Sequence, residues 1–136
     1  ATSADAGNIT EVHMSIGSRL ADTLLGMPFV ILGYEAAKEP GGRVAAAEKL
    51  GVPSPELAVK VNGAAMVLGG AALIAGVYPR AAATGLAAAL VPTTVAGHAY
   101  WNDTDPVARN ANRIQVLKNT ALVGGLLGVI FAHSRS

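Results

Sequence analysis

Residues 94–101, with the sequence TVAGHAYW, place side chains that could carry out chemistry at the end of a long apolar run. Thr94, His98 and Trp101 are spaced i, i+4 and i+7, which predicts that they share one face of a helix. His98 is the leading functional candidate, because an imidazole exchanges protons near neutral pH and can donate to a carbonyl such as that of a quinone. The alternative is a helix-end histidine that bonds a neighbouring helix or a lipid headgroup.

Other polar residues lie at the ends of the apolar segments. Glu35 and Lys38, one helical turn apart, are interpreted either as an ion pair at the membrane interface or as a proton relay or substrate contact. Lys118 and Asn119 begin an uncharged stretch, either as an anchor that reaches the headgroups or as a ligand contact. For Asn62 we expect an interhelical hydrogen bond ahead of a ligand contact.

Several chemistries are excluded by the residues present. The chain has no cysteine, so disulfides and thiolate metal sites are excluded. No metal site is expected at His98, because His13 and His133 belong to the opposite membrane face. No phosphate loop, HExxH motif or nucleophile elbow occurs. The net charge of +1 argues against a nucleic-acid partner.

The composition indicates helices that pack together in lipid. Hydrophobic residues make up 51% of the chain and charged residues 14%, whereas a soluble domain carries about 25% charged residues. We therefore predict an all-α, integral membrane, four-helix up-and-down bundle over residues 14–136, preceded by a polar N-terminal tail at 1–13. A soluble protein with buried helices is the rival, and too little polar surface is available for it. The four helices are expected at approximately 15–37, 57–78, 80–101 and 112–133.

The connections between these segments carry their own signals. Residues 39–56 form a polar connection that includes a short amphipathic helix, residues 78–80 form a tight turn, and Asp105-Pro106 begins the last helix. Pro92 is expected to kink the third helix, with Thr93 and Thr94 bonding back to its carbonyls.

Other residues are expected to have structural roles. Arg19 and Asp22 are predicted to form a local pair, Arg80 to anchor the topology, and Pro28 to shape the first helix. Small residues spaced four apart predict close helix packing. These pairs are Ala65 with Gly69, Ala72 with Gly76, Ala81 with Gly85, and Gly124 with Gly128.

The basic residues predict the orientation of such a bundle. Four alternating helices put both termini on one side of the membrane. That side carries three basic residues and the other side seven, so the two long connections are expected in the cytoplasm and the termini outside a plasma membrane. The three are Arg19, Arg80 and Arg135; the seven are Lys38, Arg43, Lys49, Lys60, Arg109, Arg113 and Lys118.

The order of several motifs resembles the DoxX family of small bacterial membrane proteins, most closely its actinobacterial members. The resemblance covers roughly residues 15–130. It rests on MPFVILGYEAAKEP, LGVPSP, NGAAMVLGGAALIAGVYPRAAATGLAAALVPTTVAGHAYW and LKNTALVGGLLG.

The resemblance implies a four-helix membrane protein. Some relatives are subunits of a thiosulfate:quinone oxidoreductase, and others associate with enzymes of oxidative stress or sulfur metabolism. Many relatives carry an acid where this chain has Asn62, so a proton role at that position is not carried over. The family-like residues are Pro28, Gly33, Gly69, Gly70, Pro79, Arg80, His98, Trp101, Lys118 and Asn119.

Three functions remain open from the sequence. The first is an accessory or anchoring subunit of a membrane redox complex, whose partners are lipids and other subunits. The second is a quinone-binding oxidoreductase subunit, with His98 and Lys118 beside the quinone headgroup. The third is a small solute or lipid carrier, which requires a cavity between the helices. No intrinsic cofactor is expected, and a quinone or a bound lipid is the candidate ligand.

Overall fold

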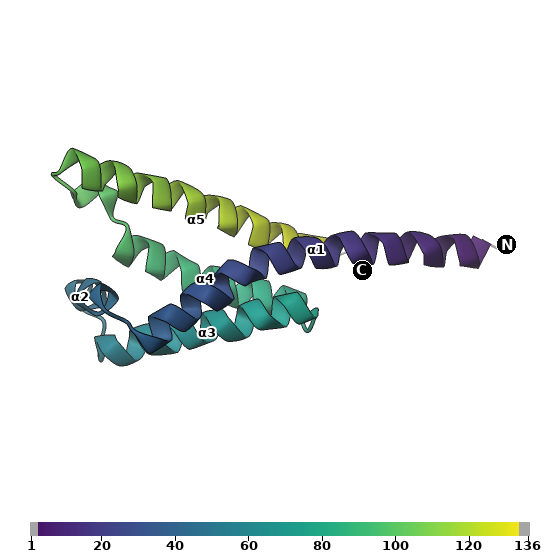
Figure 1. The fold of residues 1–136 in the computed structure, drawn as a ribbon, viewed down its shortest axis with the longest axis horizontal. Helices are drawn as coiled ribbons and strands as arrows, with labels where there is room; N and C mark the ends of the chain where they lie inside the picture. Colours follow the sequence, from purple (N-terminus) through teal and green to yellow (C-terminus); the bar gives the residue numbers. More distant parts are fainter. Residues whose placement is uncertain (1–2, 134–136) are drawn as a thin grey trace.

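The computed structural model describes residues 3–133, with side-chain surroundings for residues 16–132. This part of the chain is all-α and contains no strand, as the sequence predicts. Figure 1 labels its five α-helices. They are α1 (Ser3–Lys38), α2 (Gly42–Lys49), α3 (Pro55–Ala75), α4 (Pro79–Gly97) and α5 (Pro106–His133), with a 3₁₀ helix η1 (Tyr100–Asn102) between α4 and α5.

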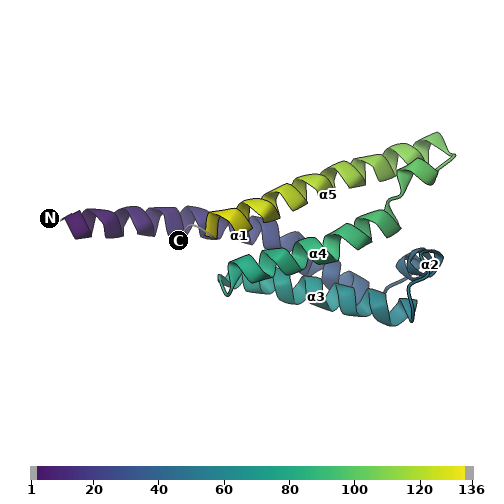
Figure 2. The ribbon, with the colours of Figure 1, turned by 180° about the vertical axis from the view of Figure 1, so that it is seen from behind.

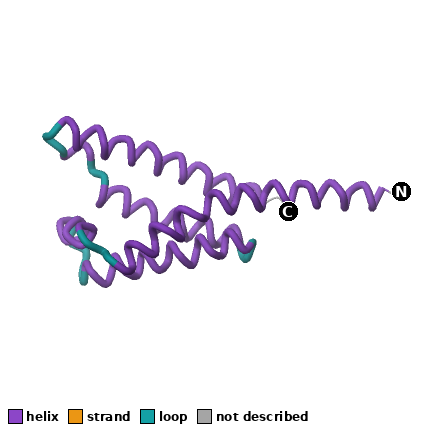
Figure 3. The backbone as a smooth tube through the Cα atoms, viewed as in Figure 1, coloured by secondary structure: helices purple, strands orange, loops and turns teal. Residues whose placement is uncertain are grey.

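The four long helices run in alternating directions (Figures 1 and 2). Helix α1 packs along α3, and α4 lies between α3 and α5. The short helix α2 lies across the end of the bundle where α1 ends and α3 begins. Figure 3 shows that the loops lie at the two ends of the bundle. The arrangement is therefore up-and-down, with a fifth helix that the expected four-helix fold did not include as a separate element.

Three helices of the described chain are long and apolar enough to cross a membrane. They are Ile16–Lys38 within α1, Pro55–Ala75, which is α3, and Pro106–Ala132 within α5. Helix α4 does not reach the same hydropathy, because its 19 residues include Arg80, Pro92 and three threonines. The prediction of four equivalent spanning segments therefore holds for three of them by length and composition.

Helix α4 ends earlier than the sequence predicted, at Gly97 in place of residue 101. The backbone N–H of His98 still donates to the Thr94 carbonyl at 3.0 Å, but His98 has a φ of −133° and leaves the helix. Trp101 then lies in η1. The expectation that Thr94, His98 and Trp101 share one helix face is wrong, because glycine ends the helix before its last turn.

The predicted connections are present, but the tight turn expected at 78–80 lies at 76–78, because α3 ends at Ala75 and α4 already begins at Pro79. Gly76, with a φ of 73°, caps α3, and α4 begins three residues later at Pro79. Helix α5 begins at Pro106, and a carboxylate oxygen of Asp105 accepts from the backbone N–H of Ala108 at 3.1 Å. The polar connection at 39–56 contains α2.

Two pairs of glycines bring the backbones of α1 and α3 together. A Cβ atom added to Gly33 would lie 2.6 Å from the carbonyl oxygen of Gly63, and one added to Gly26 would lie 2.7 Å from that of Gly70. The two glycines of each helix are seven residues apart, so they lie on one face. The helices can approach this closely only because no side chain intervenes.

The small-residue pairs predicted from the sequence play a lesser part. Among the described residues, no atom of a neighbouring helix lies within 4 Å of a Cβ added to Gly76, Gly85, Gly124 or Gly128. Only Gly69 of those pairs meets another helix, with a Leu86 side-chain carbon 2.9 Å from its added Cβ. Alanine and glycine are common throughout this chain. A spacing of four therefore also occurs on exposed helix surfaces that do not pack against a neighbour.

The centre of the bundle is small and apolar. Phe29, Leu73, Leu86 and Leu126 are almost fully buried, one from each long helix. Large apolar side chains also cover the outside, where Leu68 is 72% exposed. A soluble monomer rarely exposes so much apolar surface, and lipid-facing helices do so routinely. The apolar exterior therefore agrees with a membrane location.

We expect Gly63→Ala to destabilise the bundle by about 1–3 kcal/mol, the usual cost of overpacking. The added methyl would meet the Gly33 carbonyl and the Ala37 backbone N–H, 2.8 Å away. Thermal unfolding in detergent, followed by helical circular dichroism, measures the effect. Gly124→Ala is the control, because its added Cβ meets nothing. Equal stability of the two variants would contradict the glycine contact.

Candidate ligand-binding cavity

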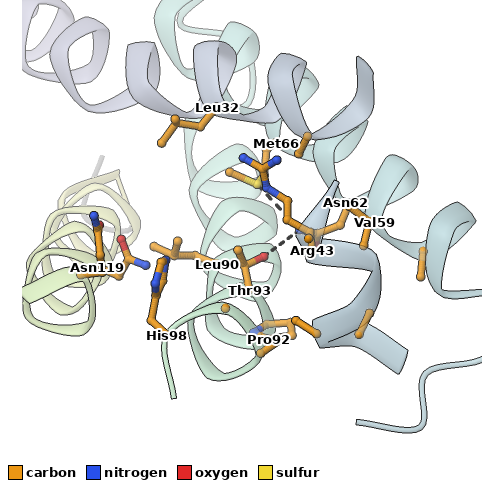
Figure 4. A pocket seen from close by; sticks show the side chains of 18 of the residues that line it. Leu32, Arg43, Val59, Asn62, Met66, Leu90, Pro92, Thr93, His98 and Asn119 are labelled. Carbon is orange, nitrogen blue, oxygen red and sulfur yellow. Dashed lines mark hydrogen bonds between the residues drawn. The ribbon is translucent and has the colours of Figure 1, made fainter. Parts of the chain in front are cut away.

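A cavity of about 730 Å³ lies between the helices and takes residues from all five of them. Its wall is mainly apolar, with contributions such as Phe29, Leu32 and Leu90. Pro28 and Pro92, which the sequence singled out as structural, are also part of its wall. Pockets for small molecules have volumes of roughly 300–1,000 Å³, so a ligand of that size fits here. Figure 4 shows the cavity from close by.

Polar side chains enter this apolar wall from three helices. Asn62 of α3, Thr93 and His98 at the end of α4, and Asn119 of α5 all line the cavity and face it in Figure 4. Of the candidate residues from the sequence, the structure thus brings three together: Asn62, His98 and Asn119. They are half-buried.

Two threonines after Pro92 attach α4 to its neighbours. The Asn62 amide donates to the Thr93 hydroxyl at 2.8 Å, and the Asn119 amide donates to the Thr94 hydroxyl at 2.9 Å. The interhelical hydrogen bond predicted for Asn62 is confirmed. Consecutive residues of a helix point in different directions, so one threonine reaches α3 and the next reaches α5.

Each threonine also bonds back to its own helix, as predicted. Thr93 donates to the Ala89 carbonyl and Thr94 to the Leu90 carbonyl, both at 2.8 Å. These bonds satisfy hydroxyl protons in a segment where Pro92 has removed one backbone donor. The last turns of α4 are therefore hydrogen-bonded to α3, to α5 and to carbonyls of α4 itself.

His98 is bonded to the neighbouring helix α5. Its Nδ1 lies 3.2 Å from the side-chain oxygen of Asn112, and the Asn112 amide nitrogen donates to the Asp103 carboxylate at 2.8 Å. The interpretation of His98 as a helix-end histidine bonded to another helix is thus confirmed. The same ring also lines the cavity, and its functional role stays a prediction.

The other four candidates of the predicted polar cluster lie outside the cavity wall. Glu35, Lys38, Trp101 and Lys118 are exposed, and none lines the cavity. The Lys38 ammonium lies 5.9 Å from the centre of the Tyr34 ring, and the described contacts include no ion pair between Lys38 and Glu35. Spacing of one helical turn allowed that pair, but the described contact of the Lys38 ammonium is with the aromatic ring.

Trp101 contributes to the rim of the bundle. Its ring packs edge-on against Tyr100, with ring centres 5.3 Å apart, and it is 52% exposed. Such a pair of amphipathic rings is typical of the membrane interface.

The residues given structural or topological roles are placed as follows. Arg19 and Arg80 are exposed, near the start of the first spanning segment and at the start of α4. Asp22 is only 8% exposed and does make an interaction; its pairing with Arg19 stays a prediction. Arg135 and the side chains of His13 and His133 lie outside the described residues.

The sequence analysis missed several members of the site. Arg43 and Gln115 line the cavity, and Asn112 and Asp103 hold His98. Arg43 belongs to α2, and an Nη of its guanidinium donates to the Glu39 carbonyl at 3.3 Å. Asn112, Gln115 and Asn119 all lie on α5 with the spacing i, i+3 and i+7, so a shared helix face was an available signal for them. Sequence spacing offers no such signal for Arg43 on α2 or for Asp103 in the loop before α5.

Metal ligands do not gather in the described part of the chain. No group of three or more His, Asp or Glu side chains that could hold an ion lies together there. The polar atoms that face the cavity are amides, hydroxyls, an imidazole and one guanidinium.

The chain belongs to the DoxX family. The DoxX family model matches residues 20–99, which is more than half of the chain and extends from α1 to the end of α4. The match includes Asn62, Thr93 and His98, and it stops before Asn112 and Asn119. No curated protein and no solved structure matches this sequence.

We expect Asn62 and Thr93 to be energetically coupled. A double-mutant cycle with Asn62→Ala and Thr93→Val, measured by unfolding in detergent, should give a coupling of about 0.6 kcal/mol and at most about 1.7 kcal/mol, as for other interhelical bonds in membranes. The matched cycle pairs Thr93→Val with Asn110→Ala, because Asn110 is exposed on α5. Strict additivity for Asn62 and Thr93 would contradict the bond.

Proposed function

We propose that this DoxX family protein is a multi-pass accessory subunit of a membrane-associated redox complex, and that it holds a quinone-type ligand in the cavity described above. The observation that carries the proposal is the apolar cavity of about 730 Å³ that ends at Asn62, His98 and Asn119. An apolar wall with a few convergent polar groups suits an amphipathic ring with a hydrocarbon tail.

The direction of the helices supports four crossings, although α4 is the least apolar of the long helices. Helices α3 and α5 run in the same direction (Figures 1 and 2). If both cross the bilayer, the chain must return between them, and α4 is the segment that does so. Its 19 residues span about 28 Å at 1.5 Å per residue, close to the roughly 30 Å of a hydrocarbon core.

The cavity then lies near one membrane face. The end of α4, the start of α3 and helix α2 meet at that end of the bundle (Figure 1). The excess of basic residues on that side supports an orientation in which this face of the plasma membrane is the cytoplasmic one. A ligand in the cavity would have its head at the cytoplasmic rim and its tail among the helices.

We expect single-cysteine variants to report this topology, since the chain has no cysteine of its own. In intact cells, a membrane-impermeant thiol reagent should label Val77→Cys, in the turn between α3 and α4. Thr104→Cys, between η1 and α5, should be labelled only after permeabilisation. Glu48→Cys on α2 lies at the same end of the bundle as Thr104, so as a control it should also be labelled only after permeabilisation.

The labelling separates the two parts of this topology. Labelling of Val77→Cys and Thr104→Cys from the same side would show that α4 does not cross. Labelling of Thr104→Cys in intact cells, with Val77→Cys labelled only after permeabilisation, would retain the four crossings and overturn the orientation.

The groups facing the cavity suit ligand binding. His98 contributes the imidazole of the wall, a side chain that can donate or accept a hydrogen bond, and it is held by Asn112. With no cysteine in the chain, electrons for a bound quinone are supplied or taken by a partner subunit. These two features support an accessory, ligand-holding role within a complex.

A second candidate function is a carrier for a lipid or small apolar solute. The size of the cavity and its contact with all five helices favour it. A carrier would accept many apolar molecules, whereas a quinone-holding subunit would discriminate by the headgroup.

We expect Ala96→Trp to abolish or strongly weaken binding of a decyl-substituted benzoquinone to the purified protein in nanodiscs. Ala96 lines the cavity, so the indole would occupy ligand space. The adjacent Val95 faces outward, and Val95→Trp is the matched control with full binding. Fluorescence or calorimetric titration measures the dissociation constants. Retained binding in Ala96→Trp, or no binding to the parent protein, would overturn the cavity as the quinone site.

A further inference from the structure

The donors of two threonines and of Asn62 are used within the protein. Thr93 and Thr94 each donate their hydroxyl proton to a carbonyl of α4. A hydroxyl has one proton, so each threonine oxygen can only accept from its amide partner. The nitrogen atoms of the Asn62 and Asn119 amides must therefore face the threonines.

Asn62 retains only an acceptor. One N–H of its amide goes to the Thr93 hydroxyl, and the amide nitrogen also lies 3.7 Å from the Met66 sulfur, which takes the other. Its side-chain oxygen has no described partner and retains its lone pairs. Asn119 retains one N–H and its oxygen.

The state of the His98 ring follows from a similar argument. A carboxylate only accepts, so the Asn112 nitrogen must face Asp103 and the Asn112 oxygen must face His98. The Nδ1 atom then carries the hydrogen. In the neutral ring Nε2 is left as an acceptor.

We propose that Asn62, His98 and Asn119 form an acceptor cluster that recognises a hydroxyl-bearing aromatic amphiphile, so that the cavity prefers the reduced, hydroquinone form of a quinone-type ligand. Asp103 and Asn112 are positioning residues that hold His98 in the Nδ1–H tautomer. This inference rests on the proposed function and adds the chemical form of the ligand.

The donors that remain in the cavity wall do not reverse this preference. They belong to Arg43, Gln115 and Asn119. A phenolic hydroxyl can donate to Nε2 of His98 and still accept from one of these groups. A carbonyl or an ether only accepts, so it leaves the ring nitrogen and the Asn62 oxygen without a proton donor.

A matched pair of probes tests the preference without redox chemistry. 4-Heptylphenol and its methyl ether, 4-heptylanisole, differ in one hydroxyl proton. We expect the phenol to bind the protein in nanodiscs about tenfold more tightly, the effect of one net hydrogen bond. His98→Phe should reduce the difference between the probes, and Trp101→Phe, outside the cavity wall, should preserve it.

The outcomes separate this inference from the proposed function. Equal binding of both probes to the parent protein overturns the acceptor cluster and leaves a ligand-holding cavity in place. Absence of binding for both probes and for the decyl benzoquinone overturns the proposed function itself.

The role of the positioning residues has a spectroscopic test. We expect ¹⁵N NMR of the imidazole to show the proton of His98 on Nδ1, with the signal assigned through its loss in His98→Phe. Asn112→Leu should move the proton to Nε2 and reduce the preference for the phenol. Asn110→Leu, exposed on the same helix, should change neither. A proton on Nε2 in the parent protein overturns the inference.

Discussion

A polar group inside a lipid bilayer has no water to bond, so its partner must come from the protein. This constraint accounts for the last turns of α4. Pro92 removes a backbone donor, and the threonines that follow bond both to their own helix and to amides of α3 and α5. One short polar segment thereby links three helices. Three of the bonded side chains are part of the cavity wall: Asn62, Thr93 and Asn119.

The contact between α1 and α3 has a different physical origin. Lipid tails are as apolar as leucine, so helices gain little from burying leucine against each other in a membrane. Close backbone contact at Gly26 with Gly70, and at Gly33 with Gly63, provides van der Waals attraction instead. Helix α5 approaches α1 toward its C-terminal end and diverges from it toward the other end (Figure 1). Residues of α2 also line the cavity.

The cavity unites the features that bear on function. An apolar volume reaches amides, an imidazole and a guanidinium at one end of the bundle. In the proposed function, such a site would hold an amphipathic molecule by its tail and orient it by its head. Asp103 and Asn112 bond to each other and to the imidazole, so in that proposal residues beyond the cavity wall would influence which headgroup fits best.

The sequence by itself determined the class of this protein and most of its elements. Apolar length and low charge predict membrane helices, and prolines after polar residues mark where α4 and α5 begin, because these effects act within a few neighbouring residues. The threonine back-bonds were also predictable, since they join residues four apart. The early end of α4 was not predicted: glycine favours a helix end at Gly97, but the pairing of His98 with Asn112 on another helix is not visible in the sequence.

Only the tertiary structure decided which polar residues share a site. One cavity brings together Asn62, His98 and Asn119. The other four candidates lie at the same end of the bundle but outside the wall of the cavity: Glu35, Lys38, Trp101 and Lys118. Chain order assigns residues to a membrane face. It does not set the rotation of each helix about its axis, which is fixed by packing with its neighbours, and that rotation determines which side chains point inward.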